Sequence, residues 1–235
     1  MKTKLLYLDN SYLKECDARV VEVNKNKVIL DKTVFYARGG GQPTDKGIIK
    51  KGEEEFKVLE VRKENGEIVH VIDIEGLEEG DSVHCILDWS RRYKLMRMHT
   101  AAHVLASIFF KDYNAKITGN QIEEEKTRFD FSMDNFDREK MEKAIEKANS
   151  YLSQDTEVKV YYMPREEALK NPEMVKLASA LPPSIDPLRI VEIPFIDIQA
   201  DGGTHVRNLR EVGKIKLLKL ENKGKNNKRI YFVVE

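Results

Sequence analysis

Residues 90–111 read SRRYKLMRMHTAAHVLASIFFK, and at this stretch the pattern of the chain changes from strand-like to helical. The stretch contains neither glycine nor proline, and its apolar residues recur at helical spacings, which predicts one long helix. We take Ser90 as the residue that caps its N-terminus. The apolar positions are Leu95, Met96, Ala102, Val104, Leu105, Ile108 and Phe109.

The residues before this helix alternate between apolar and polar in short runs, for example at 18–23, 56–61 and 68–74. A turn signal, Asn24–Lys27, follows the first run, and this spacing is typical of a small β-barrel or sandwich. The residues after it mix both patterns, so we expect an α+β fold. Strands are predicted at 127–133, 158–162, 190–198, 212–220 and 230–234, helices at 135–153 and 165–178, and a loop at 181–183.

Composition excludes several classes of protein. The 235 residues contain 40 Lys and Arg against 40 Asp and Glu, and no apolar run is long enough to cross a membrane. Two cysteines cannot make a disulfide framework, so a reducing, cytoplasmic location is expected. The zero net charge conceals a division, because residues 1–88 carry −4 and residues 89–235 carry +4.

His99 and His103 occupy positions i and i+4 of the predicted helix, so both imidazoles can reach one metal ion. The alternative is two partly buried histidines that are satisfied by hydrogen bonds. A zinc peptidase needs a Glu directly after the first His as its general base, and Thr100 stands there instead. A peptidase is therefore disfavoured.

A third histidine ends the segment Asp201-Gly-Gly-Thr-His205. Its two glycines allow a tight turn and a close approach of the backbone to a ligand. Asp201 and His205 are four residues apart, and three histidines with a carboxylate or a water suit zinc. A turn between strands with a surface histidine is the alternative.

Residues 35–45 read FYARGGGQPTD, which lacks the Gly-Lys-Ser/Thr ending of a phosphate-binding loop. No strand-to-helix context surrounds the segment, so we expect no dinucleotide cofactor. Three successive glycines indicate a close backbone approach, either to a ligand or, as we favour, to the second domain.

Four motifs give the chain a resemblance to the free-standing alanyl-tRNA editing proteins of the AlaX type, which are similar to the editing part of alanyl-tRNA synthetase. They are YARGGGQPTD (36–45), HTAAH (99–103), RFDFS (128–132) and DGGTH (201–205). Together they occur in the family's order and at its spacing, and the resemblance covers essentially the whole chain.

The resemblance implies a zinc-dependent, ATP-independent hydrolase that deacylates mischarged tRNA(Ala) at its acceptor end, chiefly Ser-tRNA(Ala) and secondarily Gly-tRNA(Ala). It implies a β-barrel domain over residues 1–89, like a domain of translation factors. An editing domain shared with threonyl-tRNA synthetase would follow over residues 90–235. One zinc per chain would be bound by His99, His103 and His205.

The fourth zinc ligand of the family is often a cysteine, and Asp201 stands in its place. Whether Asp201 binds zinc, holds a water or supports the ligands stays open. Thr100 and Thr204 adjoin ligand histidines and are candidates to bond a serine hydroxyl, although Thr204 is better explained by the shape of its turn. The candidate catalytic residues are Thr100, Asp201 and Thr204, and the candidate substrate or interdomain residues are Gly39, Gly40, Gly41, Gln42, Thr118, Asn120, Gln121 and Arg128.

A second class of function fits the same motifs, namely a non-catalytic tRNA- or ribosome-binding module with a structural zinc. Two basic runs are candidates for a nucleic-acid contact in either case, although such a run is more often a solvated face. Nine Lys and Arg against three acids lie between His205 and Glu235, and a shorter run follows Trp89: Arg91, Arg92, Lys94 and Arg97. Ester hydrolysis would separate the two classes, and the sequence predicts no oligomeric state.

Overall fold

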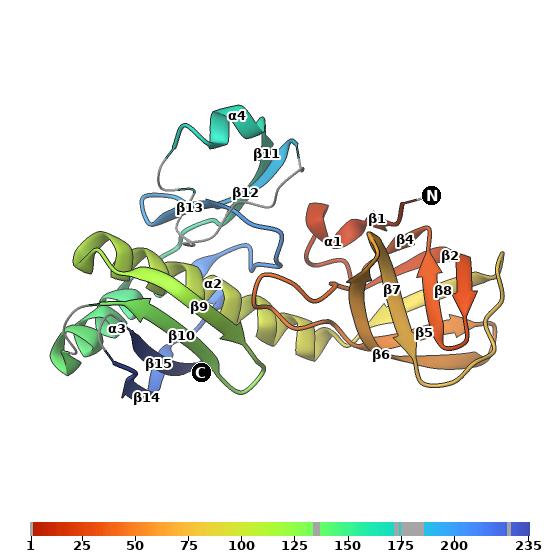
Figure 1. The fold of residues 1–235 in the computed structure, drawn as a ribbon, viewed down its shortest axis with the longest axis horizontal. Helices are drawn as coiled ribbons and strands as arrows, with labels where there is room; N and C mark the ends of the chain where they lie inside the picture. Colours follow the sequence, from red (N-terminus) through yellow and green to blue (C-terminus); the bar gives the residue numbers. More distant parts are fainter. Residues whose placement is uncertain (1, 134–136, 172–173, 175–185, 225–226) are drawn as a thin grey trace. The chain divides into compact units, whose positions relative to one another are not determined.

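The computed structural model describes residues 2–133, 137–171, 174, 186–224 and 227–235. The chain forms two compact units, residues 1–94 and 95–235 (Figure 1). The first contains a closed barrel and the second contains helices and two sheets, which confirms the predicted α+β class. The predicted loop at 181–183 and most of the predicted helical segment beyond residue 171 lie outside the described residues.

Six antiparallel strands close the barrel of the first unit in the order β2-β3-β7-β6-β5-β8. A short parallel pair, β1 with β4, and the one-turn helix α1 complete the unit. The bounds are β1 Lys4–Leu5, α1 Leu6–Asp9, β2 Glu15–Asn24, β3 Lys27–Leu30, β4 Lys32–Thr33, β5 Gly47–Lys51, β6 Glu54–Glu64, β7 Glu67–Ile72 and β8 Ser82–Leu87.

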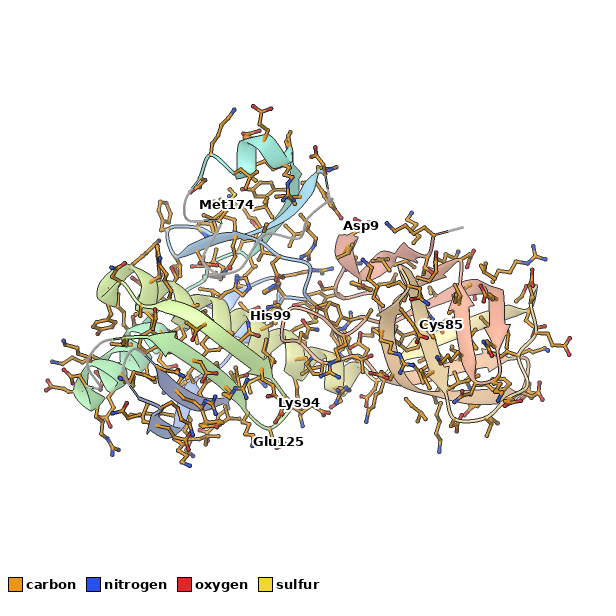
Figure 2. The ribbon with its side chains drawn as sticks, in the orientation of Figure 1. Asp9, Cys85, Lys94, His99, Glu125 and Met174 are labelled. Atoms are coloured by element: carbon orange, nitrogen blue, oxygen red, sulfur yellow. The ribbon has the colours of Figure 1, made fainter. Side chains whose placement is uncertain are left out.

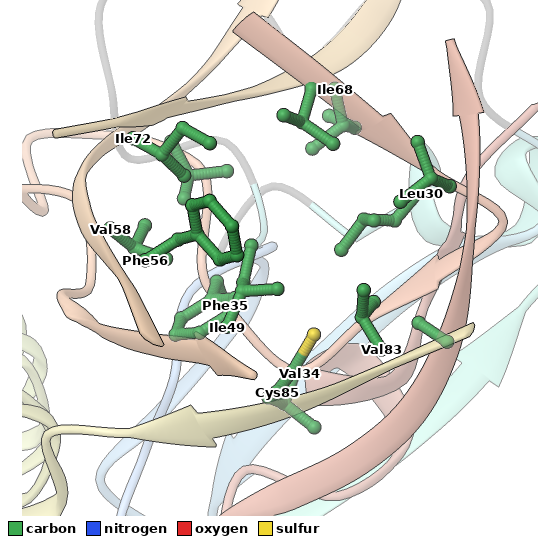
Figure 3. Close-up of a cluster of buried hydrophobic side chains, with 14 of the residues drawn as sticks. Leu30, Val34, Phe35, Ile49, Phe56, Val58, Ile68, Ile72, Val83 and Cys85 are labelled. Atoms are coloured by element: carbon green, nitrogen blue, oxygen red, sulfur yellow. The ribbon is translucent and has the colours of Figure 1, made fainter. Parts of the chain in front are cut away.

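The alternating pattern of these strands places their apolar side chains inside the barrel, where they form one core (Figure 3). In β6, for example, Phe56, Val58 and Val61 are buried, and a register shift after Val58 accounts for the change of phase. Each fully buried large apolar side chain contributes about 1.5–3 kcal/mol. The period-two pattern in the sequence therefore predicts the packing of this unit correctly.

The first unit also contains a buried ion pair that was not predicted from the sequence. Arg92 and Asp45 are fully buried, and the guanidinium Nε lies 3.1 and 2.9 Å from the two carboxylate oxygens of Asp45. The same guanidinium donates to the backbone carbonyls of Val34 and Ser11 at 2.7 and 2.8 Å. One member of the basic run after Trp89 therefore holds the fold together and does not face solvent.

The long helix α2 (Trp89–Tyr113) confirms the helix predicted over residues 90–111. The predicted cap was wrong, because Ser90 lies in the first helical turn. Asp88 takes that place: its Oδ1 accepts from Arg91 N at 3.1 Å, and its carbonyl accepts from Arg92 N at 3.0 Å. Neither α2 nor another helix among the described residues is long and apolar enough for a membrane span.

A four-stranded antiparallel sheet in the order β14-β15-β10-β9 forms one layer of the second unit. Its inner face carries Phe129, Phe131 and Phe232, and Phe109 of α2 packs on Phe131 with ring centroids 4.2 Å apart. The bounds are β9 Lys116–Ile122, β10 Thr127–Ser132, α3 Arg138–Leu152, β14 Ile215–Asn222 and β15 Lys228–Val234.

A smaller antiparallel sheet, β11-β12-β13, lies in the same unit. The single strand predicted over residues 190–198 was wrong, because a turn at residues 194–196 divides it into β12 and β13. Pro194 offers no ladder donor, and Phe195 adopts a φ of 65°, which reverses the chain. The bounds are β11 Lys159–Met163, α4 Arg165–Ala168, β12 Leu188–Ile193, β13 Asp197–Ala200 and the 3-10 turn η2 Leu209–Glu211.

Candidate functional site

The helix α2 carries two of the three candidate histidine ligands on one face. His99 and His103 are 4% and 6% exposed, and their ring centroids are 4.9 Å apart. Figure 2 labels His99 among the side chains. Alanines at 101 and 102 and the absence of glycine keep this turn regular, so the i, i+4 spacing is realised as predicted.

The third histidine arrives on the loop that follows β13. His205 is 3% exposed, and its ring centroid lies 4.3 Å from that of His99 and 4.6 Å from that of His103. Gly203 makes this approach possible, because a Cβ there would lie only 2.2 Å from His99 Cε1. Close contact with His99, and not an unusual backbone angle, therefore requires glycine at this position.

Asp201 completes the group and is held from both sides. Its Oδ2 lies 3.0 Å from His205 Nε2 and accepts from Gly203 N at 2.6 Å. Its backbone carbonyl accepts from the guanidinium of Arg189 at 2.8 Å, and its N–H donates to the Arg189 carbonyl at 3.1 Å. One ligand atom from each of Asp201, His99, His103 and His205 lies within 4.8 Å of all the others.

Burial sets the charge of this group. It lowers the pKa of His99 well below the usual value, and it lowers the pKa of His205 to about 4 against the opposing effect of Asp201. For Asp201, burial raises the pKa, but the neighbouring histidines outweigh burial and hold that pKa well below its usual range. A metal site needs deprotonated ligands, and these directions favour them at neutral pH.

Two polar side chains fix the orientation of the imidazoles. His103 Nδ1 lies 3.0 Å from Oδ2 of the buried Asp197, which also accepts from Gln199 at 2.7 Å. A carboxylate only accepts, so Nδ1 of His103 donates and its Nε2 keeps the lone pair. Carboxylate–histidine pairs of this kind commonly support metal ligands.

Thr100 plays the corresponding role for His205. Its hydroxyl donates to the Met96 carbonyl at 3.0 Å and accepts from Val206 N at 3.3 Å, and it lies 3.2 Å from His205 Nδ1. Because the hydroxyl proton is engaged with Met96, the Nδ1 of His205 is the donor of that pair. The Nε2 of His205 then keeps its lone pair on the side of Asp201.

The donor set fits a zinc ion. Three imidazole nitrogens and one carboxylate are typical zinc ligands, and tetrahedral coordination at about 2.0–2.1 Å needs ligand atoms about 3.3 Å apart. The four atoms lie within 4.8 Å of one another, so small rotations of the side chains would bring them to that spacing. Among the described residues this is the only group of its kind.

The other predicted residues lie at several places. Gly39 and Gln42 exchange backbone hydrogen bonds of 3.2 and 2.9 Å around Gly40 and Gly41, which adopt φ of 58° and 86°. Two positive φ values in such a turn explain both central glycines. Thr204 is fully buried beside His205. Thr118, Asn120 and Gln121 lie on β9, and Arg128 lies opposite Gln121 on β10.

Three residues of the site were missed by the sequence analysis: Arg189, Asp197 and Gln199. The available signal was the spacing of polar residues: Asp197, Gln199 and Asp201 are each two residues apart. In a strand this spacing places Asp197 and Gln199 on one face of β13. No sequence pattern pointed to Arg189. Its contact with Asp201 depends on the pairing of β12 with β13, and these were predicted as a single strand.

Comparisons with known proteins agree with this architecture. Residues 3–91 match the family described as "tRNA synthetases class II (A)", and residues 188–231 match "Threonyl and Alanyl tRNA synthetase second additional domain". The chain is 37% identical to "Alanine--tRNA ligase" of Ignicoccus hospitalis over 98% of its own length and 26% of that protein.

Two further relatives match from end to end. "Alanyl-tRNA editing protein AlaX-M" of Saccharolobus solfataricus is 49% identical, and its namesake from Methanosarcina barkeri is 45% identical, each over 99% of both chains. Identity at this level over the full length, with the editing-domain match at residues 188–231, shows that this chain belongs to the family of alanyl-tRNA editing proteins.

Proposed function

We propose that this chain is a zinc-dependent hydrolase that deacylates mischarged tRNA(Ala), with Ser-tRNA(Ala) as the main substrate and Gly-tRNA(Ala) as the second. The observation that carries the proposal is the group of three buried histidines, His99, His103 and His205, with the half-buried Asp201. The printed names of the full-length relatives support tRNA editing as the activity.

The donor atoms of this group would hold one zinc ion. Zinc bound there supplies Lewis acidity, which suits the hydrolysis of an ester. Asp197 and Thr100 hold the imidazoles of His103 and His205 in the orientation that leaves Nε2 unprotonated. An aminoacyl ester is already activated, so a positioned water and a fixed carbonyl are sufficient for its hydrolysis.

Thr100 and Thr204 are the candidates for the choice between serine and alanine. Both are fully buried, and each adjoins a histidine of the group. A site that hydrogen-bonds the serine hydroxyl rejects alanine, because alanine would leave a buried polar group unpaired. Thr100 already makes three polar contacts, so its contact with the substrate would have to replace or share one of them.

Hydrolysis of Ser-, Gly- and Ala-tRNA(Ala) by the zinc-loaded protein tests the proposal, together with elemental analysis for one zinc per chain. We expect release of serine first, glycine second and alanine least. The control variant is His84→Ala, which removes a histidine of the barrel unit. Salt-sensitive binding of tRNA without release of any amino acid would instead support the non-catalytic tRNA-binding module.

A further inference from the structure

The turn between β12 and β13 presents an aromatic ring without cover. Phe195 is fully exposed, with a relative accessibility of 103%, whereas the next most exposed large apolar side chain in the described residues reaches 55%. Its φ is 65°, in the left-handed region that favours glycine. The chain therefore has a large apolar residue at a position where the backbone angle favours glycine and where the side chain gains no stabilisation from burial.

The backbone of this turn is nevertheless held firmly. Ile196 N donates to the Ile193 carbonyl at 2.9 Å, which closes the turn. The Ile196 carbonyl accepts from the Ser107 hydroxyl and, at 2.9 Å, from the Lys111 ammonium, both on α2. The ring is exposed, but the backbone that carries it is fixed to the helix of the histidines.

The position of the turn relative to the candidate metal centre follows from the helix. His103, Ser107 and Lys111 are spaced by four residues and share one face of α2. The Ile196 carbonyl of the turn bonds both Ser107 and Lys111, which at 1.5 Å per residue lie about 6 and 12 Å along the axis from His103. The residue after the turn is buried Asp197, which accepts from His103.

That separation corresponds to a short piece of single-stranded RNA. A stacked strand advances about 3.4 Å per nucleotide, and an extended one advances further, so about 6 to 12 Å spans roughly one to three nucleotides. With the aminoacylated ribose at the histidine group, an upstream base of the unpaired 3′ terminus would reach the turn. The Lys111 ammonium, which donates to the Ile196 carbonyl of the same turn, adds a positive charge that favours the RNA backbone.

We propose that Phe195 is a stacking platform for an unpaired nucleobase near the 3′ end of the substrate tRNA, one to three nucleotides from the esterified ribose. This inference rests on the proposed function. A protein partner fits less well, because it would need an apolar patch of several hundred Å². Ile196 is buried and Pro194 is half-buried, so within this turn the described residues present a single exposed ring, and stacking needs only one ring.

The test compares Phe195→Gly with the wild-type protein on two substrates, Ser-tRNA(Ala) and the short ester 3′-seryl-adenosine. Loss of one stacked base should lower kcat/KM on the tRNA by about 5- to 150-fold, mainly through KM, and should leave the short ester unaffected. Glycine suits the positive φ, so Tm should stay the same or rise by up to about 4 °C. A loss of activity without a loss of stability is the expected signature.

Two further substitutions separate stacking from simple apolar cover. Phe195→Trp should restore the wild-type rate on tRNA, whereas Phe195→Leu should behave like Phe195→Gly. Leu218→Ala is the matched control, since Leu218 is a half-exposed apolar residue of β14 in the same unit. Full activity of Phe195→Gly or Phe195→Leu on tRNA overturns the proposal, and so does an equal loss on the short ester.

Binding of uncharged tRNA by fluorescence anisotropy is measured in parallel with the same variants. A wild-type protein that hydrolyses neither ester refutes the proposed function. Weaker binding of uncharged tRNA by Phe195→Gly, by the same 5- to 150-fold, would still support the platform. Equal Kd values for the wild type and Phe195→Gly would reject it.

Discussion

The buried histidines of the two units differ in the direction of their ring nitrogens and not in their burial. In the barrel, His70 is fully buried, and both nitrogens have partners: the Thr33 hydroxyl at 2.8 Å and the Val28 carbonyl at 3.1 Å. In the second unit, His99, His103 and His205 turn nitrogens toward one another and toward Asp201.

Burial lowers the pKa of His70 to about 4, as it does that of His205. A lowered histidine pKa therefore does not distinguish a core residue from a candidate ligand. Convergence of several nitrogens on one point distinguishes them. A similar contrast holds for two carboxylates: the buried Asp45 neutralises Arg92 in the barrel unit, whereas the half-buried Asp201 faces three histidines.

The largest expected effect is the removal of a ligand from the converging group. His99→Ala should lower serine release from Ser-tRNA(Ala) by more than about 1000-fold and should lower the zinc content, because a ligand and its lone pair are lost. Elemental analysis and the deacylation assay measure both effects. A His99→Ala variant with wild-type activity would show that the group does not carry the reaction.

The barrel is expected to respond in stability instead. Arg92→Met leaves the buried Asp45 carboxylate without its partner and should cost about 3–5 kcal/mol of unfolding free energy in urea. The double variant Arg92→Met/Asp45→Asn should recover much of that loss, because no buried charge then remains. A loss below about 1 kcal/mol for Arg92→Met would contradict the assigned role of this pair.

The lowered pKa of His70 predicts that this barrel residue makes its own contribution to the pH dependence of stability. Its pKa in the folded state, about 4, lies below the unfolded value of about 6.5, so the unfolded chain binds a proton that the folded chain excludes. The contribution is complete above about pH 6.5 and is lost as the pH falls toward 4. Between pH 7 and pH 5 the loss should be about 2 kcal/mol.

Urea unfolding of the wild type and of His70→Gln at pH 7 and pH 5 measures this contribution. The change in unfolding free energy between the two pH values is determined for each protein, and the two changes are compared. Histidines of the second unit titrate equally in both proteins and therefore cancel. The pH-dependent loss of stability should be about 2 kcal/mol smaller in His70→Gln. Identical losses would mean that His70 is protonated in the folded protein.

The smallest effect is expected at a residue that acts through a candidate ligand. Asp197→Asn keeps the shape of the side chain but weakens the acceptor for His103 Nδ1, so zinc affinity or activity should fall by about 10- to 100-fold. Competition with a chelator measures the affinity. A change below twofold in both quantities would show that His103 is oriented without Asp197.

Local patterns predicted most of the elements, missed the strands β5 and β9, and placed several ends wrongly. The alternation of residues 1–88 indicated the barrel, and the helical spacing of residues 90–111 indicated α2, because burial of one face enforces each period. The cap of α2 was misassigned, since Asp88 and Ser90 are both good caps and only the backbone path selects one. The turn at residues 194–196 was missed because Pro194 was not taken as a break between the apolar residues on its two sides.

The candidate site was predictable to the extent that its residues are neighbours in sequence. The i, i+4 spacing of His99 and His103 follows from helix geometry, and the DGGTH motif named His205 and Asp201. Asp197 and Arg189 were missed, because their roles depend on contacts across 94 residues to His103 and across two strands to Asp201.

The sequence by itself indicated the α+β class, the resemblance to the editing-protein family and three converging histidines, with Asp201 as a further candidate, since each depends on residue types at short spacings within a motif. Only the tertiary structure decided that Gly203 must lack a side chain against His99, that Arg92 is buried on Asp45, and that Phe195 is exposed on a fixed turn. Those three facts arise from contacts between segments far apart in the chain. The zero net charge and the local patterns carry no information about such contacts.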